Sequence, residues 1–305
     1  MAKLSLKYRI LRSLVKASGI KKKMFPGEEK ELLDLAKKQA KNKNIPNLSH
    51  PDLTVTVKKF QGEDVVCFHH RNPSEYACLF LIGGGMVKYP RPASIKKALQ
   101  IAVETGRDMI VPYYPLCIEN DISVVYDWIY DLYKKIIEVY SADKVMVTGS
   151  SSGGNLALGL IAHINKKKEK LPYPQKIYVS SPGECLGSGE VRQKAKELDA
   201  YDVAISAGFM EMAEHFMRKN KTNLPDYMFY LEQGDFHGLS EVYLCYGSHE
   251  VLYSAYEPIK GALERDGVKV IAEIGEEMYH CYPFIPLCKE AKEGWERMIG
   301  YHKVI

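Results

Sequence analysis

The sequence predicts an α/β fold with a mostly parallel, eight-stranded sheet and helices on both of its faces. Along most of the 305 residues, short apolar runs rich in β-branched residues alternate with amphipathic helical segments, which is typical of parallel strands joined by crossover helices. The 46% share of hydrophobic residues and the 26% share of charged residues are those of an ordinary globular protein. A glycine-rich turn at residues 149–154 joins a strand-like run to a helix-forming run.

The first half of the chain supplies five of the expected strands. The first two form a hairpin that turns at residues 61–64, Gln-Gly-Glu-Asp. The strands are expected at 53–60, 64–69, 77–82, 108–111 and 144–148. The first helix between them, 94–105, has Ser94 as its expected N-terminal cap and Gly106 just past its end. Two further helices are expected at 121–140 and 152–165, of which the longer places an apolar stripe inward.

The second half completes the alternation, but two segments stand outside it. Strands are expected at 176–180, 241–246 and 268–274, and helices near 254–265 and 286–300. Residues 1–48 and 184–238 read as helical, the latter with a Lys/Glu-rich stretch and a second helix at 207–219. We therefore expect an N-terminal helical cap segment (1–48), a first core part (49–183), a helical cap insertion (184–238) and a second core part (239–305). An insertion above the strand ends would form a lid.

Charge and cysteine content exclude several classes of protein. The formal net charge is only +4, from 42 Lys and Arg against 38 Asp and Glu, which is too weak to indicate nucleic-acid binding. The seven cysteines include no Cys-x-x-Cys pair, so reduced thiols in a cytoplasmic protein fit better than a disulfide framework or a metal site. No apolar run approaches the roughly 18–20 residues that a membrane-spanning helix needs.

The N-terminus predicts a basic amphipathic helix. Leu4, Tyr8, Leu11 and Val15 share one helical face, while basic residues interrupt any apolar core of a secretory signal. Such a helix can rest on an anionic membrane surface. Packing on its own protein is the more common arrangement, and it is the one we expect.

The turn at residues 149–154 has the pattern of a nucleophile elbow. In Gly-x-Ser-x-Gly a serine occupies a strained turn between strand and helix, and the flanking glycines leave room where the two elements nearly touch. Of the three consecutive serines, Ser151 has glycine both two residues before it, at Gly149, and two residues after it, at Gly153. The hydroxyl of Ser151 would then project at a helix N-terminus, where a developing negative charge is favoured.

Two other interpretations of the same residues were weighed. A plain Gly/Ser turn accounts for the five-residue pattern about as well when that pattern is taken alone. The run from Thr148 to Asn155 also approaches the glycine-rich turn of short-chain dehydrogenases, and Tyr256 with Lys260 supplies a Tyr-x-x-x-Lys pair. The third glycine is replaced by Asn155, however, and the motif lies in the middle of the chain, so an NAD(P)-dependent dehydrogenase is a remote alternative.

A second glycine turn follows the strand 77–82. Gly83, Gly84 and Gly85 expose backbone N–H groups that no side chain hides, as the oxyanion of an acyl-transfer intermediate requires. We expect the oxyanion donors to be the N–H of Gly83 or Gly84 together with that of Ser152, directly after the nucleophile. Taken alone, the three glycines would indicate a simple turn. Because they follow the strand that lies two strands before the elbow, a role in binding the oxyanion is favoured.

The serine needs a base, and the base needs a carboxylate. In a fold of this kind the chain order is Ser, acid, His, with the acid after the seventh strand and the histidine after the eighth. His280 follows the last strand by a short loop, so among nine histidines it alone fits the base. Glu250 is the first carboxylate past the end of strand 241–246, and it is preferred over Asp266, Glu276 and Glu277. The remaining histidines are expected to be structural or exposed.

These motifs resemble the hormone-sensitive-lipase-like esterases of the α/β-hydrolase superfamily. Residues 149–157 are similar to that family's Gly-Asp-Ser-Ala-Gly-Gly-Asn-Leu-Ala, and the segments 247–252 and 277–280 resemble its acid loop and its Gly-Met-Pro-His. Residues 114–119 are a degraded Tyr-Arg-Leu-Ala-Pro-Glu. The chain departs from the family at Ile82, where the His of His-Gly-Gly-Gly is missing, and at Ser150, where the family has Asp.

The motifs and the resemblance together imply a serine hydrolase. We expect ester hydrolysis by Ser151, His280 and Glu250, with no metal and no organic cofactor, on a small-molecule ester. Gly85, Met86 and Tyr89, after the glycine turn, are expected to contact a short or medium apolar acyl or alcohol group. Because Ile82 and Ser150 replace family residues, a catalytically weak binding protein on the same scaffold is the alternative.

Overall fold

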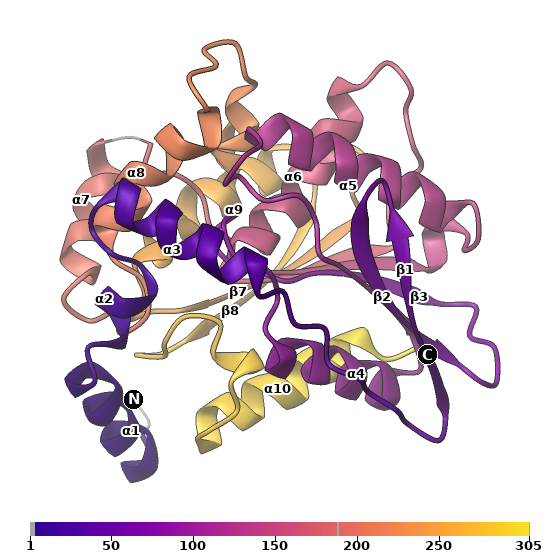
Figure 1. Cartoon of the computed structure of the whole chain (residues 1–305), viewed down its shortest axis with the longest axis horizontal. Coiled ribbons are helices and arrows are strands. Elements are labelled where there is room, and N and C mark those ends of the chain that lie inside the picture. Colours follow the sequence, from indigo (N-terminus) through magenta and orange to yellow (C-terminus); the bar gives the residue numbers. More distant parts are fainter. Residues whose placement is uncertain (1–3, 188, 305) are drawn as a thin grey trace.

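The computed structural model describes residues 4–187 and 189–304, so parts of the predicted cap segments and core (residues 1–3, 188 and 305) lie outside it. It confirms the predicted architecture of one eight-stranded sheet with helices on both faces (Figure 1). The strands are β1 (Leu53–Phe60), β2 (Glu63–His70), β3 (Ala77–Leu81), β4 (Asp108–Pro112), β5 (Val145–Ser150), β6 (Lys176–Ser180), β7 (Glu241–Gly247) and β8 (Lys269–Gly275). Their order in the sheet is β1-β2-β4-β3-β5-β6-β7-β8.

Strand β2 is antiparallel to both of its neighbours, β1 and β4, and the strands from β4 to β8 run parallel. Because parallel strands end at the same edge, β3, β5, β7 and β8 deliver the four loops that follow them to one rim of the sheet. Those loops contain the glycine turn, the elbow, the predicted acid and the predicted base.

Helices cover both faces of the sheet and build the two outlying segments. They are α1 (Leu6–Ala17), α2 (Ile20–Met24), α3 (Glu29–Lys41), α4 (Pro92–Thr105), α5 (Ile122–Ile137), α6 (Ser152–Lys166), α7 (Gly189–Leu198), α8 (Ala207–Arg218), α9 (Tyr256–Arg265) and α10 (Lys289–His302). Short 3-10 turns occur at Ala142–Lys144, Asp226–Met228, Leu231–Gln233, Val251–Ala255 and Tyr282–Phe284.

Several predicted boundaries differ from those in the structure, and two of these differences have a clear physical cause. The hairpin turns on Gln61 and Gly62 alone, both with positive φ (43° and 87°), so β2 begins one residue earlier than expected. Such a two-residue turn matches the twist of the flanking strands. Helix α4 begins at Pro92 with Arg91 as its N-cap, not at Ser94. Proline is favoured in the first helical turn because its missing N–H has no partner there in any case.

The core lies in two layers, one on each face of the sheet. Along β5, Val145 and Val147 belong to the layer that contains α5 and α6, while Met146 belongs to the layer that contains α4 and α10. This alternation is what strand geometry requires of a strand buried on both faces. All seven cysteines are free and buried.

The N-terminal segment and the insertion pack against each other. The rings of Phe25 and Phe209 lie 4.3 Å apart, and Lys21 Nζ lies 3.1 Å from the Asp199 carboxylate. In Figure 1, α2 and α3 lie beside α7 and α8, on the side of the sheet toward which the carboxyl ends of the strands point.

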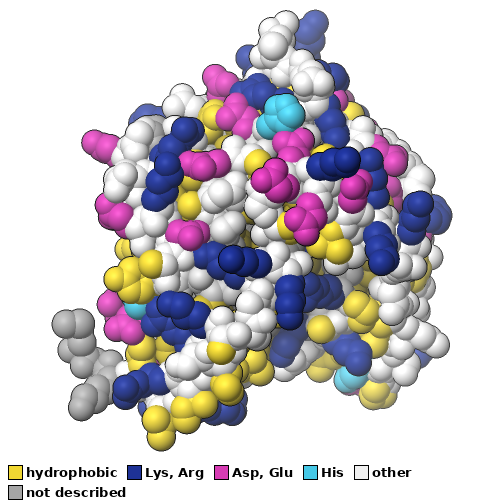
Figure 2. Space-filling model, turned by 60° about the vertical axis from the view of Figure 1, so that its left-hand side comes forward, with side chains coloured by type: hydrophobic (Ala, Val, Ile, Leu, Met, Phe, Trp, Pro, Cys, Tyr) yellow, Lys and Arg dark blue, Asp and Glu magenta, His cyan; other side chains and the backbone are white. Residues whose placement is uncertain are grey.

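Helix α1 packs inward on the segment 277–290, as expected. Tyr8 is buried, its hydroxyl donates to the Glu277 carbonyl (2.6 Å), and its ring stacks on Tyr279. The outward row of Leu6, Ile10 and Leu14 is exposed, and hydrophobic and basic side chains lie together at the lower left of Figure 2, where α1 is seen. Among the described helices none is long and apolar enough to cross a bilayer.

Candidate active site

Ser151 occupies a strained elbow between β5 and α6. Its backbone has φ 53° and ψ −130°, a conformation that costs a non-glycine residue of order 1–3 kcal/mol and that clusters at functional sites. A Cβ on Gly149 would collide with the Gly153 carbonyl, and a Cβ on Gly153 would collide with the Leu81 carbonyl of β3. The glycine spacing that singled out Ser151 is therefore a steric requirement of the turn.

Glu250 and His280 form a buried pair at the ends of β7 and β8. His280 Nδ1 lies 2.5 Å from Glu250 Oε2, and Glu250 is completely buried. The other carboxylate oxygen, Oε1, accepts the Gly247 N–H at 2.8 Å and the Ser181 hydroxyl at 2.7 Å. This set of contacts engages Nδ1 of the imidazole, so Nε2 is the ring nitrogen that faces away from the carboxylate.

The pKa of His280 is raised well above the usual value. Burial alone would lower the pKa, but the neighbouring Cys281 sulfur and the Glu250 carboxylate favour the imidazolium and prevail. A carboxylate against one ring nitrogen is the arrangement that stabilises an imidazolium formed during proton transfer.

Two residues that support this pair were missed by sequence reasoning. Ser181, which has φ 51°, donates to Glu250 and accepts the Cys281 N–H at 2.9 Å, so it ties the acid to the loop that carries the base. Cys281, with φ 53°, places its Sγ 3.5 Å from His280 Nε2. Neither follows a sequence motif; the Ser-Pro-Gly after β6 (181–183) was the available signal.

Ser151 and His280 face the same cavity, although no hydrogen bond among the described residues joins them. The nitrogen that would accept the Ser151 proton, Nε2, contacts Cys281 Sγ instead. Hydrogen bonds between nucleophile and base are often long in unliganded enzymes and tighten when substrate binds.

The glycine turn is held by serine hydroxyls. The Gly83 N–H donates to Ser150 Oγ (3.2 Å), and the Gly84 N–H donates to Ser152 Oγ (3.0 Å), which also accepts the Met86 N–H (3.3 Å). The backbone N–H groups of Gly85 and Ser152 have no hydrogen-bond partner among the described residues. The predicted oxyanion donors thus converge beside Ser151, but those of Gly83 and Gly84 already have acceptors.

Tyr114 and Ser150 stabilise the loop in which the family histidine is missing. The fully buried Tyr114 hydroxyl donates to the Ile82 carbonyl at 2.7 Å. The Ser150 hydroxyl accepts the N–H of Gly83, the next residue in the chain. The sequence placed Tyr114 only in a degraded motif and did not predict this contact.

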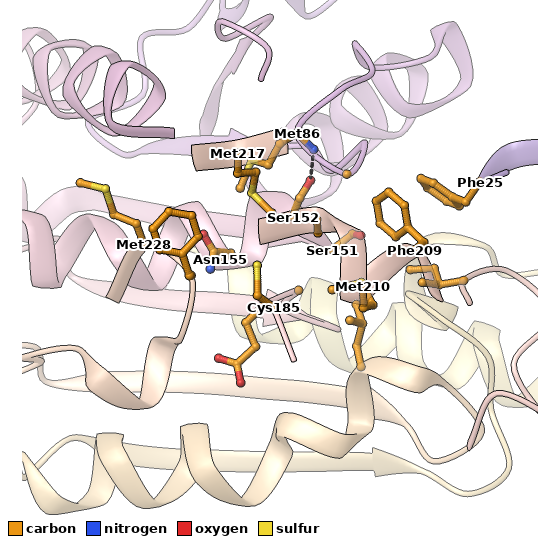
Figure 3. A pocket seen from close by; sticks show the side chains of 17 residues that line it. Phe25, Met86, Ser151, Ser152, Asn155, Cys185, Phe209, Met210, Met217 and Met228 are labelled. Atoms are coloured by element: carbon orange, nitrogen blue, oxygen red, sulfur yellow. Dashed lines mark hydrogen bonds between the residues drawn. The ribbon is translucent and has the colours of Figure 1, made fainter. Parts of the chain in front are cut away.

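Two cavities meet at Ser151. The inner one, shown in Figure 3, holds about 430 Å³ of empty space and is lined by apolar side chains from the core and from both outlying segments. In that view the rings of Phe25 and Phe209 lie on one side of Ser151, and Met217 and Met228 lie on the other. Gly85 and Met86, expected to contact substrate, line this cavity.

The inner cavity contains one carboxyl side chain, that of Glu184, among its described lining residues. Burial, together with the nearby Glu232 carboxyl, raises the pKa of Glu184 well above its usual value. A protonated Glu184 leaves the inner cavity neutral, which suits an apolar group.

The outer cavity is larger and open to solvent, with about 1570 Å³ of empty space. Its walls come from the glycine turn, the start of α4 and the loop 280–287 that carries the base. Tyr89, also expected to contact substrate, lies in this wall, and its hydroxyl donates to the Glu63 carboxylate. His280 lines the outer cavity and is absent from the inner one.

Other predicted competitors lie elsewhere. His302 is fully buried against Thr148 Oγ1 (2.7 Å), and burial lowers its pKa to about 3. His163 is buried and contacts the Tyr227 hydroxyl. Asp266, weighed as the acid, pairs with Arg265 at 2.8 Å. These groups have structural partners away from the elbow.

The dehydrogenase alternative gains no support. Asn155, at the position of the third glycine, accepts the Tyr126 hydroxyl through its side-chain oxygen (2.8 Å) inside the core. Lys260 pairs with Glu264 on the surface of α9, one turn away from Tyr256. The Tyr-x-x-x-Lys pair therefore belongs to an ordinary helix.

Comparison with known proteins agrees with the geometry. Residues 78–284 match the model of a family described as alpha/beta hydrolase fold. No curated protein sequence matches the chain significantly.

Similar solved structures are esterases. One, from the bacterial hormone-sensitive lipase (HSL) family, is 17% identical with a TM-score of 0.79 and coverage of 99% of both chains. An esterase/lipase from an uncultured bacterium is 18% identical, with a TM-score of 0.78 and coverage of 98% of both chains. The HSL homologue EstE7 from a metagenome library is 18% identical, with a TM-score of 0.77 and the same coverage. At these identities the likeness shows the fold.

Proposed function

This chain belongs to the family described as alpha/beta hydrolase fold, and from that premise we propose that it hydrolyses carboxylic esters of short to medium acyl chain length. The membership confirms the resemblance and the expectation of an esterase-like hydrolase. The observation that carries the finer proposal is the strained elbow of Ser151, which opens into two cavities beside the Glu250–His280 pair.

In the proposed reaction, Ser151 Oγ attacks the ester carbonyl and forms an acyl-enzyme. His280 Nε2 takes the Ser151 proton and returns it to the leaving alcohol, while Glu250 holds the imidazolium through Nδ1. Water, activated by His280, then attacks the acyl-enzyme and releases the acid.

The oxyanion is held by backbone N–H groups beside Ser151. We assign the N–H groups of Gly84 and Ser152 as donors, with Gly83 as the other predicted candidate. Because the Gly84 N–H donates to Ser152 Oγ before the reaction, that hydroxyl must give way to the oxyanion. Removing one oxyanion donor typically costs about 2.7–4 kcal/mol of transition-state stabilisation. The Gly84 N–H should therefore bind the charged oxyanion in preference to the neutral Ser152 hydroxyl.

The two outlying segments act as the proposed cap. Phe25 from the N-terminal segment lines both cavities, and Phe209 from the insertion closes the inner one. Helices that cover the mouth of a site exclude water from it, which strengthens the electrostatic interactions inside. The buried, free cysteines support a cytoplasmic location as part of this proposal.

Covalent labelling tests the assignment directly. The full chain is treated with a fluorophosphonate, and the labelled peptide is mapped by mass spectrometry. We expect the added mass on Ser151, hydrolysis of p-nitrophenyl acetate or butyrate, and loss of both in Ser151→Ala. Ser150→Ala is the matched control, because this neighbour retains the nucleophile and should still be labelled. Full turnover by Ser151→Ala would refute the proposal.

A binding protein on the same scaffold is the second candidate. It is favoured by the hydroxyls that occupy the Gly83 and Gly84 N–H groups and by the absence of a Ser151–His280 hydrogen bond among the described residues. A folded chain that neither turns over esters nor takes up fluorophosphonate would identify this case.

A further inference from the structure

The outer cavity is lined by three basic side chains. Lys88 follows the glycine turn, and Arg91 and Lys97 lie at the start of α4. No Asp or Glu is among the described residues that line the cavity. The remainder of the wall is largely apolar, with Phe80, Phe284 and Leu287 among its members.

Two of the three basic side chains, those of Arg91 and Lys97, form no salt bridge with any described residue. Lys88 is only 8% exposed, and burial together with the nearby Arg91 lowers its pKa to about 8. The Arg91 side chain has neither a hydrogen bond nor a salt bridge to any described residue, and only its backbone carbonyl accepts hydrogen bonds, from the N–H groups of Ser94 and Ile95. Lys97 contacts uncharged groups, the Gln100 side-chain oxygen at 3.2 Å and the Trp295 ring at 4.6 Å.

Like charges gathered in a concave wall create a positive potential and raise the local concentration of anions. The face shown in Figure 2 also has more basic than acidic side chains in its lower half, where Lys and Arg are numerous and Asp and Glu are few.

The position of His280 decides which part of a substrate meets these charges. The base must return a proton to the leaving oxygen, so the alcohol portion of the ester has to lie on the His280 side of Ser151. His280 lines the outer cavity, while the inner cavity is apolar and contains no cationic side chain among its described lining residues. The acyl group therefore belongs in the inner cavity and the alcohol in the outer one.

We propose that the preferred substrates are short-chain esters whose alcohol portion carries an anionic group, a carboxylate or a phosphate, bound by Arg91, Lys97 and Lys88. This inference rests on the proposed function and adds the substrate class. Arginine supplies paired N–H donors suited to either anion, and the lysines add point charges.

Matched esters test the preference. 4-Acetoxybenzoate and 4-acetoxybenzamide have nearly the same shape and differ in one negative charge. Acetylated glycerol 3-phosphate, compared with monoacetylglycerol, makes the same comparison for phosphate and shows which anion is preferred. We expect kcat/KM to favour the charged member by about tenfold at low salt in at least one pair, with the preference falling as salt is added.

Substitutions locate the effect. Arg91→Gln and Lys97→Gln should each reduce the ratio of charged to neutral kcat/KM several-fold. Lys96→Gln is the matched control, since Lys96 is exposed on the same helix and does not line the cavity. A ratio near one for the wild-type chain in both pairs overturns the inference, as does an equal reduction in Lys96→Gln.

Failure of the proposed function is distinguishable from failure of this inference. If neither member of a pair is hydrolysed, the esterase assignment fails, and binding to the Ser151→Ala chain then tests the anion site alone. Calorimetry should give tighter binding of 4-acetoxybenzoate than of 4-acetoxybenzamide. Equal affinities would overturn the anion site even where hydrolysis is seen.

Discussion

The elbow differs from the family pattern that it resembles at Ser150 and at Ser152, and the hydroxyl of Ser152 has the larger consequence for the glycine turn. Where that pattern has alanine, Ser152 accepts the N–H groups of Gly84 and Met86, so its side chain sits at the donors that an oxyanion needs. The same contacts fix the glycine turn next to the nucleophile. The Ser152 hydroxyl therefore stabilises the glycine turn, but it occupies an N–H group that a preformed oxyanion site would leave free.

Ser152→Ala should raise activity and lower stability. A neutral hydrogen bond contributes about 1 kcal/mol net, so freeing the Gly84 N–H should raise kcat by up to about fivefold. Loss of the contacts should reduce the free energy of unfolding by about 1–2 kcal/mol, measured by urea titration. Ser150→Ala is the matched control, because it releases the Gly83 N–H only. A fall in kcat with Ser152→Ala would mean that the hydroxyl positions the loop for catalysis.

The pH dependence of activity should report on the Glu250–His280 pair. The base acts only when the imidazole is neutral, so kcat/KM should rise with pH through the raised pKa of His280, above the ordinary value of about 6.5. The titratable groups that act on His280 are Glu250, Cys281 and the buried Asp202.

Glu250→Gln should shift this rise of kcat/KM, the acid limb of the pH profile, to lower pH. Removing the carboxylate leaves burial opposed by Cys281 alone, so the pKa of His280 should fall. The value of kcat should also fall, by about 10³- to 10⁴-fold, because the imidazole loses its fixed tautomer. Glu276→Gln, in the loop of His280, is the control and should leave the limb in place. An acid limb that stays at the wild-type pH in Glu250→Gln would show that another group titrates.

At the scale of elements, the elbow is a place where strand and helix touch without side chains. Gly153→Ala should destabilise the fold by several kcal/mol, because its Cβ would meet the Leu81 carbonyl of the neighbouring strand, where backbone has to move. Gly208→Ala in α8 is the control: nothing lies within 4 Å of the added Cβ, so it should stabilise the helix by about 0.5–1 kcal/mol. Urea unfolding midpoints compare the two, and equal shifts would contradict the steric account.

The sequence predicted most elements because strand and helix periodicities are local. It predicted the bounds of β6 correctly, and glycine spacing alone indicated the position of the strained turn at Ser151. It misplaced the start of α4, where the proline preference overrode the expected Ser94 cap. Tyr114, Ser181 and Cys281 were not predicted, because none of them follows a spacing rule. Tyr114 meets Ile82 across 32 residues of chain, and Ser181 meets Cys281 across 100.

At the scale of the whole molecule, the acid loop is tied to the insertion. Asp202, buried between α7 and α8, accepts the Val251 N–H through Oδ2 (2.8 Å), directly after Glu250, while its other oxygen accepts N–H groups of its own loop. Burial raises the pKa of Asp202, whereas the nearby His280 lowers it. The proposed cap and the pair proposed to activate Ser151 are thus one connected structure.

The cap should also set the length of the acyl group. The inner cavity of about 430 Å³ is closed by Phe209 of the insertion, which packs on Phe25 of the N-terminal segment. Phe209→Ala removes this wall, so the preferred p-nitrophenyl ester should shift from acetate or butyrate toward hexanoate or octanoate, seen in kcat/KM along that series. The neighbouring Met212 lies on the same helix without lining the cavity, and Met212→Ala should keep the wild-type profile. If Phe209→Ala lowered kcat/KM equally for every chain length, the inner cavity would not hold the acyl group, and the assignment of acyl and alcohol to the two cavities would have to be reversed.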